Sequence, residues 1–470
     1  MGKYSRLGKN TLLVFVGNVG SKLIGLLMLP FYTHWLSKAD YGITDMINIC
    51  VTISISAITC CLSEAIFRLP KGQLLDIQKK YFSTGLFFSS TGLCVAAIVF
   101  FIITRFFLEK SIFSTYSTLI YLIILTTFLQ SYFQQFTRSI DQMKIYVISG
   151  VLLTVFTAGF AFVLIPKFGL TGFLWSQIMA TFCASLYTLI FGKLWNYISI
   201  RAINMVRFRE MIKYSLPLVP NSIMAWLING ANRFFLEKYH GLDTVGIFAT
   251  ALKFPMLIGT FFQVFFISWQ ISVIEEFKTD RYSDFYNKIF SLVFLGLTVS
   301  MLAIAFSSGL LTTIFVDEKF SDAQHYIPIL TIAPIVSCLA VFVGANFTAS
   351  KETKYLFSTT VYGGLTSIAG NILLIPPFGI MGAAYSQILS FAVMLVLRAY
   401  HTRKMVIIKQ KILYLCSFVA LLLIVFFINS DLYVKIPMMI LLILSILYFN
   451  KSGINFIIHA IKVHHKTHQT

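Results

Sequence analysis

Long apolar runs, each close to the length needed to cross a lipid bilayer, most constrain the fold of this chain. A membrane-spanning helix needs about 20 mainly apolar residues, and the 470-residue sequence contains fourteen such runs. They lie near 10–36, 43–67, 82–107, 115–137, 145–165, 170–191, 214–236, 246–274, 289–315, 326–349, 355–375, 380–399, 412–429 and 433–449. Only 12% of the residues are charged, where soluble domains have about 25%. The sequence therefore predicts an all-α polytopic membrane protein with about 14 transmembrane helices.

The basic residues lie mainly on one side of the predicted spans. The formal net charge is +19, and an amino terminus placed inside puts almost all of the excess in segments predicted to be cytoplasmic, as the positive-inside rule requires. The cytoplasmic clusters include Arg68, Lys71, Lys79, Lys80; Lys193, Arg201, Arg207, Arg209, Lys213; and Arg398, Arg403, Lys404, Lys409, Lys411. We expect both termini in the cytoplasm and anionic lipid headgroups nearby. Because topology accounts for the charge, nucleic acid is not an expected partner.

An internal repeat divides the chain into two halves. Residues 165–178 (IPKFGLTGFLWSQI) recur at 375–388 (IPPFGIMGAAYSQI), with eight identities in fourteen positions. Each copy is predicted to form a short external turn, in which Pro ends one helix and Gly lets the chain reverse. Six spans separate the copies, so the repeats are parallel, and transport sites lie between such halves near the midplane. We predict two six-helix lobes around a central cavity, 1–200 and 201–405, and then two extra helices with a basic tail in 406–470.

Cations inside the spans are candidate functional residues, because a charge in the bilayer is costly. Lys22 lies roughly 20 Å along the first helix from Lys9, too deep for a Lys side chain to reach the interface, and we expect it to line a polar cavity. Lys253 lies roughly 10 Å into the eighth span, and we expect the same of it. Arg233 is near the outer end of the seventh span, where cargo binding and outward snorkelling are both open.

The second span contains three more ionisable residues. Glu64 and Arg68 stand at i and i+4 near its cytoplasmic end, a spacing that suits an ion pair, and a structural pair, a gate and a cargo site are all open. Asp45, two residues into the span, is either interfacial or functional. We take Lys22, Arg68, Arg233 and Lys253 as candidate substrate-binding residues. Glu64 and Asp45 are candidates for gating or ion coupling.

The nature of the cargo follows weakly from the same residues. The ionisable groups of the spans are slightly more basic than acidic, which favours an anionic cargo over a cationic drug. A phosphate or pyrophosphate group fits, because Lys and Arg are its usual partners. Trp175, Trp226 and Trp269 could stack on sugars, although placement in the aromatic belts or the core is the simpler explanation.

Chemistry-bearing motifs are not evident in the sequence. The seven cysteines all lie in apolar runs without metal-ligand spacing, so we expect no metal site. The sequence contains no Gly-rich phosphate loop, no nucleophile elbow and no His group with metal-ligand spacing. We therefore expect neither an enzyme with catalytic residues nor a cofactor.

Several segments resemble a known transporter family. Leu7-Gly-Lys-Asn-Thr11, Gly20-Ser-Lys-Leu-Ile-Gly25, Leu29-Pro-Phe-Tyr-Thr33 and Tyr41-Gly42 are similar to the opening of the polysaccharide-type flippases (Wzx, transporters of O-antigen or capsule repeat units) of the MOP exporter superfamily. Asn232-Arg-Phe-Phe-Leu236, Gly246-Ile-Phe248 and Ala251-Leu-Lys-Phe254 look like the matching region of the second half. The resemblance covers about residues 5–400.

The resemblance implies a function. It implies flipping of undecaprenyl-pyrophosphate-linked oligosaccharide repeat units from the cytoplasmic to the periplasmic or outer leaflet of a bacterial cytoplasmic (inner) membrane, by alternating access of the two lobes. Lys22 would hold the pyrophosphate, and the polysaccharide polymerase and chain-length machinery are candidate partners beside membrane lipids. In one departure, Asn232 stands where the family often has Asp, which puts an acid–base pair with Arg233 in doubt.

Two other classes are weighed against this interpretation. A drug or cation antiporter of the related MATE family shares the duplicated twelve-span plan. A resemblance to that family would imply a site with acidic residues in the first helix, whereas the first helix of this chain contains only Lys22 as an ionisable candidate. A membrane polysaccharide polymerase or lipid-linked glycosyltransferase should have a long external loop with catalytic groups. The predicted external segments here are only about 5–15 residues long.

Overall fold

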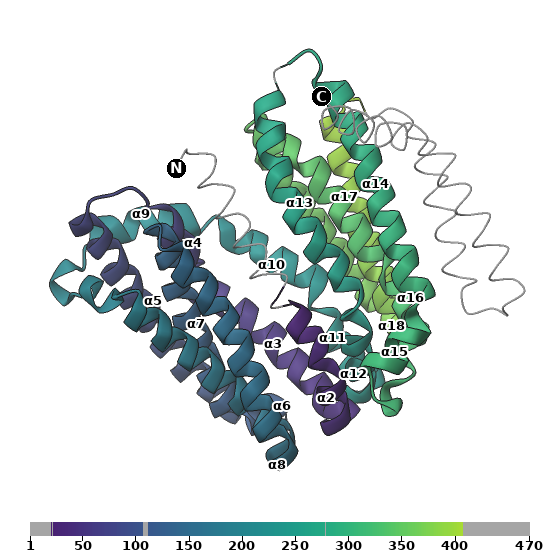
Figure 1. Ribbon diagram of the computed structural model, residues 1–470, viewed down its shortest axis with the longest axis horizontal. Helices are drawn as coiled ribbons and strands as arrows, with labels where there is room; N and C mark the ends of the chain where they lie inside the picture. The colour runs from purple at the N-terminus through teal and green to yellow at the C-terminus, as the bar shows by residue number, and fades with distance from the viewer. Residues whose placement is uncertain (1–19, 21, 107–110, 278, 408–470) are drawn as a thin grey trace, which may run out of the picture. The chain divides into compact units, whose positions relative to one another are not determined.

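The computed structural model describes residues 20, 22–106, 111–277 and 279–407, and every regular element in them is a helix (Figure 1). The chain divides into two compact units, Met1–Gly246 and Ile247–Thr470. The first contains α2 (Leu29–Trp35), α3 (Lys38–Ile58), α4 (Leu62–Arg68), α5 (Leu75–Phe106), α6 (Ile112–Thr115), α7 (Ser117–Ser139), α8 (Met143–Phe191), η1 (Leu194–Tyr197), η2 (Ile200–Ala202), α9 (Met205–Ser215), α10 (Leu218–Asn229), α11 (Asn232–His240) and the start of α12 (Leu242–Leu252). The second contains the rest of α12, α13 (Pro255–Glu276), α14 (Tyr282–Phe306), α15 (Ser308–Phe315), η3 (Glu318–Phe320), α16 (Ala323–Leu330), α17 (Ile332–Ala349) and α18 (Lys354–Thr402).

Eight helical segments in the described residues are long and apolar enough to cross a membrane. They are α3, α5, α7, α8, α13, α14, α18 and the pair α16–α17 taken together. This finding confirms the all-α polytopic fold class. The expected spans 412–429 and 433–449, and the part of the first span before Gly20, lie outside the described residues. The count of fourteen therefore stays a prediction.

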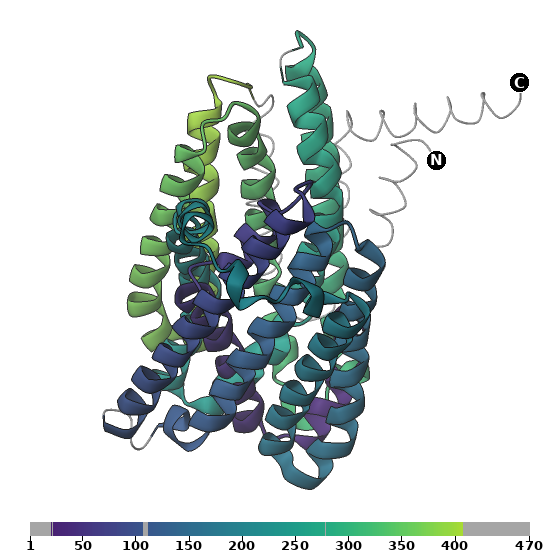
Figure 2. The same ribbon diagram turned by 90° about the vertical axis from the view of Figure 1, so that its left-hand side faces the viewer.

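The two longest helices are hairpins. α8 and α18 each contain 49 residues, which as one straight helix would extend about 74 Å, well beyond the roughly 30 Å thickness of the hydrocarbon core. In each of them the chain reverses at a glycine, Gly169 in α8 (φ 53°, ψ −129°) and Gly379 in α18 (φ 54°, ψ −126°). The reversal of α8 is visible in both views (Figures 1 and 2). Each hairpin supplies two of the spans expected from the sequence.

The repeated motif explains these turns. Gly169 and Gly379 have positive φ with strongly negative ψ, a conformation almost restricted to glycine. Three residues later, a Cβ on Gly172 would stand 2.2 Å from the Leu164 carbonyl oxygen, and a Cβ on Gly382 would stand 2.0 Å from that of Leu374. The two arms thus touch backbone to backbone beside the turn, which only glycine permits.

Other predicted spans are interrupted rather than continuous. The span predicted at 43–67 is broken after α3, where Cys60 (φ 48°) and Cys61 (φ 55°) both have left-handed backbone before α4 begins. The span predicted at 246–274 is broken between α12 and α13, because Pro255 begins a new helix. Broken helices at membrane depth are tolerated where the freed backbone groups find partners in the protein.

The boundary between the compact units falls later than the lobe boundary expected near residue 200. α9 packs against α4 and α5, and α10 packs against α3, so the segment up to Gly246 groups with the first unit. The six-helix lobes as functional units, and the parallel relation between them, stay predictions.

Candidate functional site

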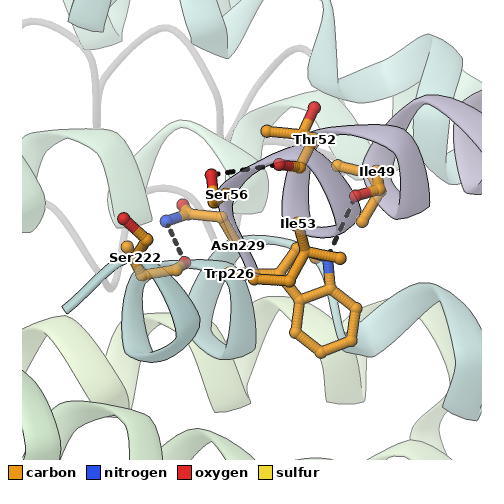
Figure 3. Close-up of a pocket in the computed structure, with 9 residues that line it drawn as sticks. Ile49, Thr52, Ile53, Ser56, Ser222, Trp226 and Asn229 are labelled. Carbon is orange, nitrogen blue, oxygen red and sulfur yellow. Dashed lines mark hydrogen bonds between the residues drawn. The ribbon is translucent and has the colours of Figure 1, made fainter. Parts of the chain in front are cut away.

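A pocket of about 320 Å³ lies between α3 and α10 in the first unit (Figure 3). Four lining residues come from each helix, at the spacing i, i+3, i+4 and i+7, which places them on one face of that helix. They are Ile49, Thr52, Ile53 and Ser56 on α3, and Ser222, Ala225, Trp226 and Asn229 on α10; Gly230 follows at the end of α10. The pocket is thus built where two helical faces meet.

Four polar side chains of the pocket donate hydrogen bonds to backbone carbonyls. The Thr52 hydroxyl donates to the Asn48 carbonyl (2.9 Å), and the Ser56 hydroxyl donates to the Thr52 carbonyl (3.2 Å). Asn229 Nδ2 donates to the Ala225 carbonyl (2.8 Å), and Trp226 Nε1 donates to the Ile49 carbonyl (3.2 Å). Figure 3 shows the bonds that Ser56, Asn229 and Trp226 donate. The hydroxyl oxygens of Thr52 and Ser56 can therefore act as acceptors in the pocket.

An ion pair joins α3 to α11, four residues along the chain from the pocket residues Ile49 and Asn229. Arg233 Nε donates to Asp45 Oδ2 at 2.9 Å, and the two side chains are only 6% and 17% exposed. Arg233 Nη1 also donates to the Asn229 carbonyl and to Asn232 Oδ1 (2.9 Å). Arg233 therefore ties α11 to α3 and to the pocket residue Asn229, and its charge is compensated.

Sequence reasoning singled out both partners of this pair but did not join them. Asp45 and Arg233 are 188 positions apart, and no local pattern connects them. The departure at Asn232 acquires a physical meaning, because the acid comes from α3 instead of from the residue before the arginine. Asn232 contributes a neutral acceptor to the same guanidinium.

The remaining predicted residues lie elsewhere. Lys22 is exposed on the helical stretch before α2, and Lys253 is half-buried at the bend between α12 and α13, in the second unit. Glu64 and Arg68 are exposed on α4. The ion pairs found in the described residues do not join Glu64 to Arg68, and the Arg68 guanidinium instead stands 5.9 Å from the centre of the Tyr214 ring.

One basic residue assigned by sequence to a cytoplasmic cluster is buried. Arg398 is 6% exposed, and it donates from Nε to Thr359 Oγ1 (3.1 Å), from Nη1 to the Ala340 carbonyl (2.9 Å) and from Nη2 to Thr360 Oγ1 (3.1 Å). Within the described residues no acidic side chain pairs with it. Sequence reasoning missed this burial, although Arg398 lies inside the apolar run 380–399 and the other basic residues of the cluster follow that run.

A second ion pair lies outside the predicted spans, on α9. The Tyr81 hydroxyl donates to Glu210 Oε2 (2.5 Å), and Arg207 Nη1 donates to both carboxylate oxygens (2.8 and 2.9 Å). The hydrogen bonds from Tyr81 and then Arg207 lower the pKa of Glu210, and the bond to Glu210 raises the pKa of Arg207. The carboxylate is therefore ionised at neutral pH and holds α9 to α5.

Comparison with known proteins places this chain in a family. Residues 7–270, more than half of the chain, match the family model described as polysaccharide biosynthesis protein. The chain belongs to this family. Capsular polysaccharide biosynthesis protein CapF of Staphylococcus aureus is 24% identical over 206 residues, which are 43% of this chain and 52% of CapF. The probable low-salt glycan biosynthesis flippase Agl15 of Haloferax volcanii is 26% identical over 213 residues, 43% of each chain.

This polysaccharide biosynthesis family member spans about half the length of the curated relatives it matches. Solved structures are similar over much more of the chain. The lipid II flippase MurJ in an inward closed conformation has a TM-score of 0.68 at 15% identity, covering 96% of this chain and 99% of MurJ. An inward-facing MATE family multidrug transporter of the MOP superfamily has a TM-score of 0.58 at 12% identity, covering 83% and 95%. The chain has the fold of MOP superfamily transporters.

Proposed function

We propose that this protein flips a lipid-linked glycan across a membrane. The observation that carries the proposal is the family match over 7–270 in a chain whose helices adopt a transporter fold. Agl15, a partial relative, is named a glycan biosynthesis flippase, and the nearly full-length structural neighbour MurJ is named a lipid II flippase. Both names support a lipid-linked glycan as the cargo of this chain.

The finer proposal concerns the cargo and its path. The cargo is an undecaprenyl-pyrophosphate-linked oligosaccharide repeat unit, moved from the cytoplasmic to the outer leaflet of the bacterial cytoplasmic membrane by alternating access of two lobes. Anionic phosphates need cations, and Lys22, Arg68 and Lys253 are assigned to them. Both termini are assigned to the cytoplasm because of the one-sided basic residues.

Arg233 receives a different assignment from the other candidate cations. Its guanidinium is held by Asp45 and Asn232 and is nearly buried, and withdrawing a buried arginine from its carboxylate is costly. We assign Arg233 and Asp45 to positioning α3 and α11. Glu64 stays a candidate for gating or ion coupling.

Deletion of the protein tests the proposed function. Cells without it should make the lipid-linked saccharide, retain it on the cytoplasmic leaflet and lose the surface polysaccharide. Leaflet-resolved labelling of the extracted lipid measures this. Normal surface polysaccharide together with altered drug resistance would contradict the proposal and favour the MATE-like antiporter, whose fold the chain shares.

Lys22 tests the phosphate assignment. Lys22→Ala should leave the amount of protein in the membrane unchanged and remove most export, because it deletes the charge assigned to the phosphate and also removes the cost of about 3 kcal/mol that insertion scales give for a Lys at the helix centre. Lys22→Arg keeps the charge and should retain part of the export. Export is measured as surface polysaccharide per amount of protein. Full export by Lys22→Ala at normal abundance would contradict the assignment.

A further inference from the structure

The pocket between α3 and α10 offers the hydroxyl oxygens of Thr52 and Ser56 as hydrogen-bond acceptors. The hydroxyl hydrogens of Thr52 and Ser56 are used by carbonyls of α3, and the indole N–H of Trp226 is used by Ile49. In the described part of the chain, no donor reaches either hydroxyl oxygen. A hydroxyl has two acceptor lone pairs, so both oxygens can still accept.

This pattern of acceptors selects the chemistry of an occupant. A phosphate presents only acceptor oxygens at its charged face, and it would meet the lone pairs of Thr52 and Ser56 without a cation, since the nearby Arg233 is paired with Asp45. A sugar ring presents hydroxyl or amide donors at its edge and C–H groups on its faces, which suit Ile53 and the Trp226 side chain. The volume of about 320 Å³ is at the lower end for small-molecule sites, which begin near 300 Å³, and it suits one ring.

We propose that this pocket binds one neutral sugar ring of the cargo, with ring hydroxyl or amide groups donating to Thr52 and Ser56. The inference rests on the proposed function and adds that different residues bind the pyrophosphate and the saccharide. The cations hold the pyrophosphate, and the acceptor pocket holds the first sugars. The pocket thereby contributes to recognition of the saccharide and not of the lipid carrier.

Binding measurements on the purified full chain in lipid nanodiscs test whether the pocket binds the saccharide and not the lipid carrier. The two probes are bare undecaprenyl pyrophosphate and the lipid-linked saccharide extracted from cells that lack the protein. Wild type should bind the saccharide-bearing probe more tightly. The double variant Thr52→Val, Ser56→Ala should lose about thirtyfold in affinity for that probe, the value expected for two neutral hydrogen bonds, and should bind the bare carrier as wild type does.

Two variants control for structural damage. Thr52→Ser keeps the acceptor, loses the methyl group and should keep the saccharide-dependent gain. Thr91→Val removes a hydroxyl of the same kind, exposed and donating to a carbonyl four residues earlier at 2.9 Å, but on α5 and outside the pocket. It should leave both affinities unchanged.

Each contrary outcome overturns a different statement. Equal loss of affinity for both probes in the double variant would mean that the pocket holds the isoprenoid chain or supports the fold. No loss for either probe would mean that the pocket has no part in binding. If wild type binds neither probe, the proposed function itself fails, and the inference fails with it.

Discussion

The hairpins α8 and α18 have the same turn but hold their open ends together in different ways. Gly169 and Gly379 agree in φ and ψ within a few degrees, and Gly172 and Gly382 make the same close approach. Toward the open ends, the Thr188 hydroxyl donates to Ser149 Oγ (2.8 Å) in α8. At the same repeat offset of 210 residues, α18 has Arg398 bonded to Thr359.

The neighbouring helix explains the difference. α17 packs on α18, and a Cβ on Gly344 of α17 would stand 3.0 Å from Arg398 Nη1, so the missing side chain gives the guanidinium its space. In the first hairpin α7 packs on α8, and the residue of α7 at the same offset of 210 from Gly344 is Gln134. Its side chain donates to the Tyr146 carbonyl at 3.0 Å. The repeated motif thus determines the turn. The helix packed on the hairpin determines whether its second arm has space for a long polar side chain.

The largest effect is expected where the two hairpins agree. Gly172→Ala and Gly382→Ala each place a Cβ about 2 Å from a backbone oxygen, and backbone cannot move aside as a flexible side chain can. Each variant should lose about 3 kcal/mol or more of stability. Thermal unfolding in detergent, with Gly159→Ala as a control that meets no atom within 4 Å, measures the loss. A large loss in only one hairpin would contradict the equivalence of the turns.

An intermediate effect is expected at Arg398, where the hairpins differ. Arg398→Ala empties a buried site and should cost about 2 to 4 kcal/mol, as other large-to-small core substitutions do. Arg398→Met keeps most of the volume without burying a charge and should recover most of the loss. The same unfolding assay ranks the three proteins. Equal loss in Ala and Met variants would mean that the bonds to Thr359, Thr360 and Ala340, and not the filled volume, hold the arms.

The smallest effect is expected at the corresponding position of α8. Thr188→Val keeps the shape of the side chain and removes the bond to Ser149, at a cost of about 0.6 kcal/mol, the average for a hydrogen bond between membrane helices. Ser149→Ala should cost a similar amount, and the double variant should cost less than the sum, because both changes remove one bond. Strict additivity in the unfolding assay would show that this bond does not stabilise the hairpin.

Local patterns in the sequence were sufficient for the turns and the helical class. The Pro-x-Phe-Gly-x-x-Gly motif contains the residues that the reversal needs, and apolar runs of span length need helices. The sequence also supplied Lys22, Asp45 and Arg233 as residues with an unusual cost in a membrane.

Features that depend on packing between distant segments were not accessible in this way. The Asp45–Arg233 pair needs the register of α3 against α11, and the burial of Arg398 needs the space at Gly344. The acceptor pocket needs the faces of α3 and α10 to meet. The break at Cys60 and Cys61 had no local signal, because neither residue favours left-handed backbone.

The hairpin turns have a consequence for biosynthesis. Because the arms of α8 touch backbone to backbone within five residues of Gly169, the first arm cannot complete its contacts until the second has been synthesised. We expect the two arms to enter the bilayer as a pair that shares one orientation. Basic residues stand beside both open ends of each pair, Lys144 and Lys193 for α8, and Lys354 and Arg403 for α18. We expect retention of these charges on one face of the membrane to anchor a whole pair during insertion, so a residue that spoils the turn should disturb membrane topology as well as local packing.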